Sequence, residues 1–357
     1  MTALLPQALA DFARRTLPPT PTPAPAPAPA PTPAFTKPAA PPPPAVPASA
    51  VPAPGGPAYA LLADRPDGTV VRCAGTVVKA HAAGTDRAEL AARIRIAGTP
   101  ALAGVLLPPL RPEADEVHAR PVSVWPYGSP VDPERPADAP WEEAAALLAR
   151  LHRIPLADLP GPVPPMRGPA KVARALHRMA AATGPAGPYG HPYPEAADVR
   201  AAAARLPGWA RGEEPAPRSG AAALCHGDLH LGQLVRHPAP DGPWHLIDVD
   251  DLGHGAPAWD LARPAAWYAA GLLDARTWTR FLDAYRTAGG PAAGPPGTDP
   301  WPELDLAARA LTVQTAALAV TRAARAGRRL DDVERAMTDA CVRIAALRAD
   351  LEPEPPA

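Results

Sequence analysis

The spacing of apolar and polar positions changes along the chain, from an alternation typical of strands to a spacing typical of helices. In residues Tyr59–His81 apolar residues alternate with polar ones, and the alternation is broken at Asp67–Gly68 and at Ala74–Gly75. Turn residues between alternating runs predict three antiparallel strands. The run Val122–Gly128 predicts one more strand, which leads into a hinge.

From Trp141 onward the apolar residues recur at helical spacing. In residues 141–154 one face carries Ala145, Leu148, Leu151 and His152, which is typical of a helix packed on a core. A histidine on such a face is more often packed than catalytic. The same spacing predicts helices over residues 86–98, 171–206 with a break at 184–194, 260–268, 275–288, 303–326 and 331–351. Strands that come early and helices that come late indicate an α+β fold in two lobes.

Two segments precede the folded part. Residues 1–17 predict a short N-terminal helix or a disordered stretch. Residues 18–57 hold 18 prolines in 40 positions, and proline removes amide donors and favours extended conformations. We predict a disordered Pro/Ala-rich linker over 18–57, a small lobe over 58–128 and a helical lobe over 129–357. We also expect removal of residues 1–56 to leave the melting temperature nearly unchanged.

The sequence HGDLHLGQLVR begins at His226 and is followed, after a turn, by WHLIDVDD. Two apolar runs around the turn-rich segment HPAPDG predict a hairpin. The start of one strand of such a pair lies beside the end of the other, so Gln233 and Asp248 should meet at one edge, with Asp228 on the loop that leads to it. Two carboxylates and a carboxamide at one place suit a hard cation such as Mg²⁺ that bridges phosphate oxygens.

Other metal-binding interpretations of this region fail on detail. HGDLH has two histidines four positions apart, but Gly227 lies between them and no Glu follows the first, so a zinc-binding helix is not favoured. DVDDLG begins like a calcium loop, yet its fifth position is Leu252 and its twelfth is Trp259, where a bidentate Glu is required.

The order HGDLHLGQ, then LID, then Asp260 in APAWDLARP resembles the aminoglycoside phosphotransferase and choline kinase family, which has the protein-kinase-like fold. The motif differs in Gln233, where most members carry Asn, and here it is similar to the maltokinase-like branch. The resemblance runs from about Ala58 to the C-terminus. It implies a small antiparallel-sheet N-lobe and a mainly helical C-lobe. It also implies transfer of the γ-phosphoryl group of ATP or GTP to a hydroxyl group of a small molecule.

The resemblance implies a role for each residue of the motif, whose loop spans residues 226–233. Asp228 orients the acceptor hydroxyl, and Asp248 and Gln233 hold Mg²⁺. His226 packs beneath the loop and Asp260 ties the loop to the following helix, so both support the structure. The neighbouring Asp250 and Asp251 could bind substrate or metal, although acids on a polar turn are more often solvated.

Lys79 lies on the third predicted strand and is one of three lysines, with Lys37 and Lys171, in a chain that otherwise uses Arg. A compact ammonium suits contact with phosphate oxygens, and by resemblance Lys79 is the nucleotide-phosphate lysine of the small lobe. Glu89 is the candidate partner that orients Lys79. The alternative is that Asp86 and Glu89 form a capping box for the helix over 86–98.

The first hairpin has no G-x-G-x-x-G sequence to cover phosphates. Backbone groups near Val124 and Tyr127 could hold a purine ring, whereas Pro126 has no amide to offer.

The net charge is −1, which points to a small-molecule partner rather than to nucleic acid or an anionic membrane. Three cysteines without a C-x-x-C pair favour reduced thiols and a cytoplasmic location. One of them, Cys225, ends an apolar run and is interpreted as a buried strand residue, not a nucleophile. Residues 1–15 show no basic stretch followed by an apolar one, and no uninterrupted apolar run reaches 18 residues, so we expect neither secretion nor a membrane span. The oligomeric state stays open.

The acceptor is not fixed by the sequence: an aminoglycoside, a sugar and an amino alcohol all remain. Indole rings could stack on sugar rings and acids could meet a cationic acceptor, although both groups also fit a core and helix surfaces. An alternative function is a pseudokinase-like module that binds nucleotide without transfer. The candidate aromatic and acidic residues are Trp259, Trp267, Trp278, Trp301, Asp274, Asp283, Glu303 and Asp305.

Overall fold

The computed structural model describes residues 4–16, 59–65, 67–184, 193–215 and 222–347, so the predicted linker over 18–57 lies outside the described residues. The chain divides into a first unit, Met1–Gly84 with Asp115–Val124, and a second unit, Thr85–Ala114 with Trp125–Ala357. Residues 85–114 thus group with the second unit. The lobe boundary expected at residue 128 stays a prediction.

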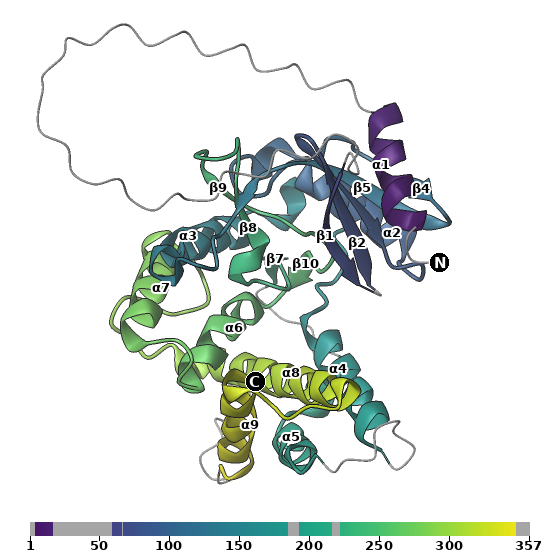
Figure 1. Ribbon diagram of the computed structural model, residues 1–357. Helices are drawn as coiled ribbons and strands as arrows, with labels where there is room; N and C mark the ends of the chain where they lie inside the picture. Colours follow the sequence, from purple (N-terminus) through teal and green to yellow (C-terminus); the bar gives the residue numbers. More distant parts are fainter. Residues whose placement is uncertain (1–3, 17–58, 66, 185–192, 216–221, 348–357) are drawn as a thin grey trace, which may run out of the picture. The chain divides into compact units, whose positions relative to one another are not determined.

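The first unit is built on an antiparallel sheet in the order β1-β2-β3-β5-β4 (Figure 1). The three strands predicted over 59–81 are confirmed, with β3 paired to β2 along its whole length. Alternation places Val71, Val78 and Ala80 on the buried face. The strands are β1 (Ala60–Arg65), β2 (Gly68–Cys73), β3 (Thr76–His81), β4 (Asp115–Val117) and β5 (Arg120–Pro126).

Helix α1 (Leu4–Thr16) packs on the sheet of the first unit. Leu9 is 0% exposed and Phe12 is 8% exposed, and both belong to the same apolar cluster as Val71 and Val78. For residues 4–16 of the segment 1–17, the structure has the helix, one of the two alternatives expected there. Its buried face also argues against the expectation that removal of residues 1–56 leaves stability unchanged, because the removal would expose this cluster.

The second unit is mainly helical and holds two small sets of strands. Strands β6 (Ser129–Pro130), β8 (Leu234–Arg236) and β9 (Trp244–Leu246) form one antiparallel sheet, and β7 (Ala223–Cys225) pairs with β10 (Gly253–Gly255). The helices are α2 (Arg87–Ala97), α3 (Trp141–His152), α4 (Gly168–Thr183), α5 (Glu195–Ala203), α6 (Ala258–Ala269), α7 (Ala275–Thr287), α8 (Trp301–Ala326) and α9 (Asp332–Ala345). Short 3₁₀ turns span Pro100–Leu102, Pro136–Asp138, Leu156–Asp158, Gly208–Arg211 and Leu231–Gln233.

Two apolar clusters organise these helices. In one, α3 packs against α7 and against β7 and β9, and in the other α4, α5, α6 and α9 pack around the long helix α8 (Figure 1). The predicted α+β class, with an antiparallel-sheet unit and a mainly helical unit, is confirmed. In the part of the chain that is described, no helix is both long enough and apolar enough to cross a membrane.

Candidate active site

The buried carboxylate of Asp260, in the first turn of α6, holds the loop that begins at His226. Its Oδ2 accepts hydrogen bonds from the His226 amide (2.6 Å) and from His152 Nε2 (2.9 Å), and its Oδ1 accepts from the Gly227 amide (2.7 Å). Burial alone raises the pKa of the Asp260 carboxyl, but these donors outweigh burial and the pKa is lowered. The carboxylate therefore stays charged and fixes the loop.

His152 extends this support to α7. Its Nδ1 hydrogen-bonds the Tyr285 hydroxyl at 2.8 Å, while its Nε2 holds Asp260. His152 lies in the core, as the sequence predicted, and it is 5% exposed. A chain of hydrogen bonds from Tyr285 of α7 through His152 of α3 to Asp260 of α6 thus connects three helices with the loop, a connection that the sequence did not reveal.

Two residues fix the conformation of this loop, Gly227 through its backbone and His230 through its side chain. Gly227 has a φ of +82°, and a Cβ there would stand 2.4 Å from the Asp251 carbonyl oxygen, so only glycine fits. His230 caps the short turn over Leu231–Gln233 by accepting the Gly232 amide at Nδ1, 3.0 Å away. Burial lowers the pKa of His230 to about 4, so its ring is neutral at pH 7 and can keep this acceptor role.

The predicted hairpin is confirmed: Leu234 pairs with Leu246 across β8 and β9, and the Ile247 amide donates to the Gln233 carbonyl at 2.9 Å. As predicted, Gln233 and Asp248 meet at one edge, where Gln233 Nε2 lies 3.5 Å from Asp248 Oδ2. Asp248 has a φ of +66°, a region that non-glycine residues rarely adopt. Such strain is commonly retained at functional sites.

The donor atoms at this edge fit a hard divalent cation. Asp248 offers a carboxylate. Rotation of the Gln233 carboxamide by about 180° would exchange Nε2 for Oε1 and direct that oxygen toward Asp248. His226 keeps Asp248 in position, because its Nε2 hydrogen-bonds the Ile247 carbonyl at 2.8 Å. Oxygen ligands without sulfur or imidazole are the set that Mg²⁺ prefers.

Asp228 lies between two cations that the sequence analysis did not assign. Its Oδ1 is 2.8 Å from Lys171 Nζ on α4 and 2.6 Å from Arg263 Nη2 on α6. Burial raises the pKa of Asp228, but the charges of Lys171 and Arg263 more than offset it, so the pKa is lowered. Asp228 is therefore ionised at neutral pH.

Both cations also hold other parts of the loop region. Arg263 Nε donates to the Leu229 carbonyl at 2.9 Å, and Lys171 Nζ is 2.8 Å from Asp251 Oδ2. The expectation that Asp251 is a solvated turn acid is wrong, because its side chain is only 15% exposed and forms this ion pair. Two signals could have identified the cations: the rarity of lysine, and the position of Arg263 one helical turn after Asp260.

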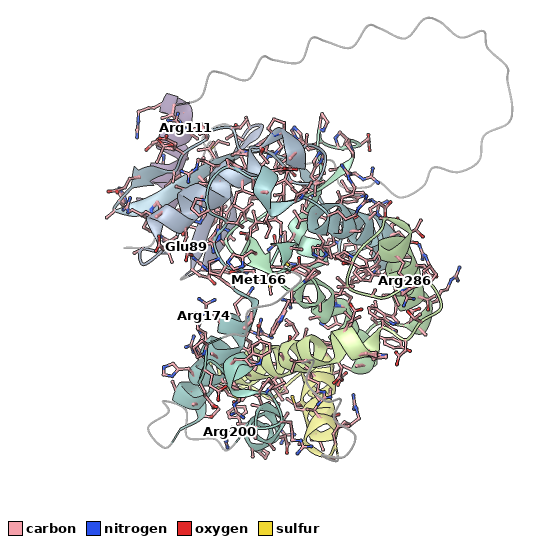
Figure 2. All side chains as sticks on the ribbon, turned by 180° about the vertical axis from the view of Figure 1, so that it is seen from behind. Glu89, Arg111, Met166, Arg174, Arg200 and Arg286 are labelled. Carbon is pink, nitrogen blue, oxygen red and sulfur yellow. The ribbon has the colours of Figure 1, made fainter. Side chains whose placement is uncertain are left out.

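A small cavity opens beside Asp228 within the second unit. Its lining includes Lys171, Asp228, Trp259, Arg263, Leu311 and Gln314. Figure 2 shows the side chains of this unit and labels Met166, just before α4, and Arg174, one turn beyond Lys171 on that helix. The cavity thus combines the loop with residues of α4, α6 and α8.

Several of the aromatic and acidic residues considered as contacts for the acceptor instead take part in core packing, helix capping or ion pairs. Trp278 stacks on Tyr268 at a centroid distance of 5.5 Å within the core. Asp274 caps α7 by accepting the Thr277 amide, and Asp305 pairs with Arg309. Among the eight candidates named from the sequence, Trp259 lines the described cavity.

Glu89 of α2 is engaged within the second unit. Its Oε2 accepts from Arg93 Nη1 and from Arg167 Nη2, both at 2.9 Å. Arg93, 1% exposed, also donates from Nε to the Leu252 carbonyl at 2.8 Å, which ties α2 to the segment after Asp248. Asp86 caps α2 by accepting the Ala88 and Glu89 amides, one half of the expected capping box. The pairing of Glu89 with Lys79 stays a prediction.

Of the remaining predicted residues, Lys79 and Val124 lie on strands and Tyr127 lies between β5 and β6. Lys79 is on β3, opposite Val70 of β2, and Val124 is buried on β5. The carbonyl oxygen of Tyr127 is 3.0 Å from His237 Nδ1. Their nucleotide-binding roles stay predictions. Cys225 is buried on β7, so its interpretation as a buried strand residue is confirmed, and burial raises the pKa of its thiol, which disfavours the nucleophilic thiolate.

The fold of this chain is similar to the folds of several solved structures. Aminoglycoside phosphotransferase APH(4)-Ia aligns with a TM-score of 0.50 at 13% identity, over 80% of this chain and 92% of that chain. A choline/ethanolamine kinase family protein from Mesorhizobium loti aligns with a TM-score of 0.48 at 22% identity, over 82% and 87%. Choline kinase LicA from Streptococcus pneumoniae aligns with a TM-score of 0.47 at 15% identity, over 78% of this chain and 89% of that chain. The likeness to APH(4)-Ia is one of fold.

A family model described as the phosphotransferase enzyme family matches residues 70–304, which include the loop, the hairpin and Asp260. The chain therefore belongs to this family, and the family resemblance read from HGDLHLGQ is confirmed. A search of curated proteins found no match. The protein is accordingly a phosphotransferase.

Proposed function

We propose that the protein transfers the γ-phosphoryl group of ATP or GTP to a hydroxyl group of a small molecule. The observation that supports the proposal is the meeting of Gln233 and Asp248 at the hairpin edge, next to a loop that carries Asp228 and that Asp260 holds, in a member of the phosphotransferase enzyme family. Phosphoryl transfer asks a protein chiefly to position the reactants and to neutralise charge, and this arrangement suits both tasks.

Asp228 orients the acceptor. Both of its ion pairs use Oδ1, so Oδ2 can accept a hydrogen bond from the acceptor hydroxyl. As the hydroxyl oxygen forms its bond to the γ-phosphorus, the bond from that phosphorus to the bridging oxygen of the β-phosphate breaks, and the hydroxyl proton passes to Asp228. The lowered pKa makes Asp228 a weak base, so its main contribution is orientation.

Asp248 and Gln233 would hold Mg²⁺, which when bound supplies positive charge to the β- and γ-phosphates. Lys79 would contact the α- and β-phosphates, with Glu89 as its candidate partner, and backbone groups near Val124 and Tyr127 would hold the purine. His226 and Asp260 support the loop through the hydrogen bonds described above.

The test is product formation. Purified protein with Mg²⁺ and either ATP or GTP is offered sugars, aminoglycosides and amino alcohols, and products are examined for an added phosphoryl group by mass spectrometry. The proposal expects nucleotide-dependent phosphorylation of a hydroxyl group in at least one class. Nucleotide binding without any transfer, even to water, would instead support the pseudokinase-like alternative.

A further inference from the structure

The ammonium group of Lys171 lies between two carboxylates that belong to different loops. Its Nζ is 2.8 Å from Asp228 Oδ1 and 2.8 Å from Asp251 Oδ2. Asp251 follows Asp248 by three residues, so it belongs to the segment that leaves the hairpin. The side chains of Lys171, Asp228 and Asp251 are 17%, 26% and 15% exposed. Salt screens charges at such depth only weakly, so this bridge differs from an ion pair at the surface.

The backbones of the two loops also touch at this point. Gly227 lies so close to Asp251 that a Cβ on the glycine would stand 2.4 Å from the Asp251 carbonyl oxygen. The same carbonyl accepts a hydrogen bond from the amide of Arg167, the residue just before α4, at 3.4 Å. Helix α4 therefore holds the Asp251 segment twice, through a backbone amide and, one turn further along, through the side chain of Lys171.

Charged and polar groups from several elements face Asp228. Arg263 of α6 contacts its Oδ1 from Nη2 at 2.6 Å, and Gln314 of α8 adds an uncharged carboxamide to the same surroundings. His230, in the loop itself, is neutral at pH 7 because burial lowers its pKa to about 4. Burial raises the pKa of Asp228, and the charges of Lys171 and Arg263 lower it by more than burial raises it.

Lys171 and Arg263 bind the same oxygen of Asp228, and this determines which oxygen is left for the acceptor. Because the two cations approach Oδ1 from different helices, rotation of the carboxylate would break both ion pairs. Oδ2 therefore keeps one direction. The direction of a group that orients a reactant matters strongly to the rate, since a displacement of about 1 Å can lower a rate by about 10²-fold.

We propose that Lys171 is a positioning residue for phosphoryl transfer: anchored by Asp251, it holds the Asp228 carboxylate with Oδ2 toward the acceptor hydroxyl. It thereby couples the loop that orients the acceptor to the segment that follows Asp248. This inference rests on the proposed function and deepens it, because it adds Lys171 and Asp251 to the residues on which transfer depends. Lys171 acts through Asp228, and Asp251 acts through Lys171.

The first measurement is steady-state transfer from Mg–ATP or Mg–GTP, to the acceptor that the product screen identifies or to water. Lys171→Met should lower kcat by about tenfold or more, because the Asp228 carboxylate loses one of its two fixed contacts. KM for the nucleotide should stay within about threefold of wild type, because the proposed metal ligands are untouched. Arg174→Met, on the exposed face of the same helix (Figure 2), should change neither quantity.

The pH profile separates positioning from a merely structural role. Removal of the Lys171 charge raises the pKa of Asp228, so the acid limb of kcat/KM should move to higher pH in Lys171→Met. Lys171→Arg keeps the charge but changes the geometry, so its acid limb should stay at the wild-type position while its kcat falls between the other two. NMR titration of the Asp228 carboxyl carbon checks the same shift without turnover. A merely structural role would lower the melting temperature and leave the limb in place.

Asp251 supplies a second, independent test. Asp251→Asn should lower kcat by about threefold or more in the wild-type background, and it should add nothing in the Lys171→Met background, because its effect passes through Lys171. Melting curves establish that each variant is folded. Should Lys171→Met fail to fold, Asp251→Asn carries the test, since it removes the anchor and leaves the cation.

The outcomes distinguish this inference from the proposed function. An active wild type together with unchanged kcat and an unchanged acid limb in Lys171→Met, or unchanged kcat in Asp251→Asn, would overturn the inference and leave phosphoryl transfer intact. Additive effects of the two substitutions would overturn the route through Lys171. Absence of both transfer and nucleotide hydrolysis in the wild type would mean that the proposed function has failed, and this inference with it.

Discussion

Gln233 is the residue whose side-chain length matters most to the metal site. It is 8% exposed, its backbone amide donates to the His230 carbonyl at 2.8 Å, and its carboxamide faces Asp248. The backbone is thus fixed, and the side chain must span what remains of the distance to the cation. An Asn, shorter by one methylene, would not reach from the same backbone position.

We therefore expect Gln233→Asn to lower turnover and to weaken Mg²⁺ binding, and Gln233→Ala to lower both further. Steady-state rates at several Mg²⁺ concentrations measure the two effects in one series. Turnover and Mg²⁺ dependence that stay equal across wild type and both variants would contradict the role of Gln233 as a ligand.

Individual residues of the site were predictable to different degrees. The hairpin pattern predicted that Gln233 and Asp248 meet, and the family resemblance implied that Asp260 supports the loop. Lys171 was not predicted, since its ion pairs join helix α4 to segments 57 and 80 positions away in sequence, and only the tertiary fold brings them together. Long-range pairing of this kind leaves no periodic trace in a single sequence.

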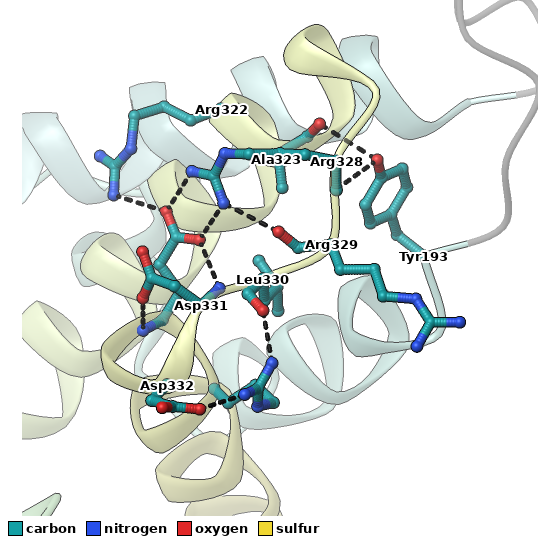
Figure 3. A network of polar contacts seen from close by, with 10 residues as sticks. Tyr193, Arg322, Ala323, Arg328, Arg329, Leu330, Asp331 and Asp332 are labelled. Atoms are coloured by element: carbon teal, nitrogen blue, oxygen red, sulfur yellow. Dashed lines mark hydrogen bonds and ion pairs between the residues drawn. The ribbon is translucent and has the colours of Figure 1, made fainter.

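At the scale of elements, the start of α9 depends on one carboxylate. Glu334 accepts from Arg328 through both oxygens, at 2.6 and 2.8 Å, and completes a capping box with Asp331 (Figure 3). The hydrogen bonds from Arg328 outweigh burial and lower the pKa of Glu334 from 4.5 to about 2. Tyr193 ties the same turn to α5 through the carbonyls of Ala323 and Arg328.

A carboxyl whose pKa is lower in the folded state stabilises the fold at pH values above its ordinary pKa. This contribution is lost as the pH falls from about 4.5 to about 2. Glu334→Gln should therefore cost about 2–3 kcal/mol of unfolding free energy at pH 7 and progressively less toward pH 2. Urea denaturation at several pH values measures the difference, with Glu113→Gln, an exposed loop residue, as control. A difference that does not depend on pH would contradict the assignment.

Helix α1 is the second element with a specific consequence. Because Leu9 is fully buried against the sheet, Leu9→Ala should cost about 2–4 kcal/mol of unfolding free energy. Leu62→Ala on β1, where the leucine is 50% exposed, should cost about 1 kcal/mol or less. Equal effects of the two substitutions in urea denaturation would show that α1 does not pack as described.

Most helices and long strands were predictable because they are long enough for the spacing of their apolar residues to show a helical or strand period. The helix at Asp86–Gly98 was predicted almost to the residue, since Asp86 caps it and Gly98 ends it. Strands β4, β6 and β10, of two or three residues each, were not predicted, whereas β7 was expected from the apolar run that ends at Cys225. A strand so short shows no alternation, and its pairing is set by partners distant in the sequence.

At the scale of the whole molecule, we propose a division of roles in which Asp228 orients the acceptor and Asp248 binds the metal and, through it, the nucleotide. Their positions support this proposal, because Asp228 is held by Lys171 and Arg263 and Asp248 meets Gln233 at the hairpin edge. The two roles predict opposite effects of substitution on binding and on turnover.

Titration calorimetry of Mg–nucleotide binding, combined with turnover of the same preparations, tests this claim most directly. Asp228→Ala should abolish transfer and leave nucleotide affinity within a few-fold of wild type, whereas Asp248→Ala should lose Mg²⁺-dependent nucleotide binding. Melting curves establish that both variants are folded. If Asp228→Ala lost nucleotide binding while Asp248→Ala retained it, the assignment of roles would be wrong.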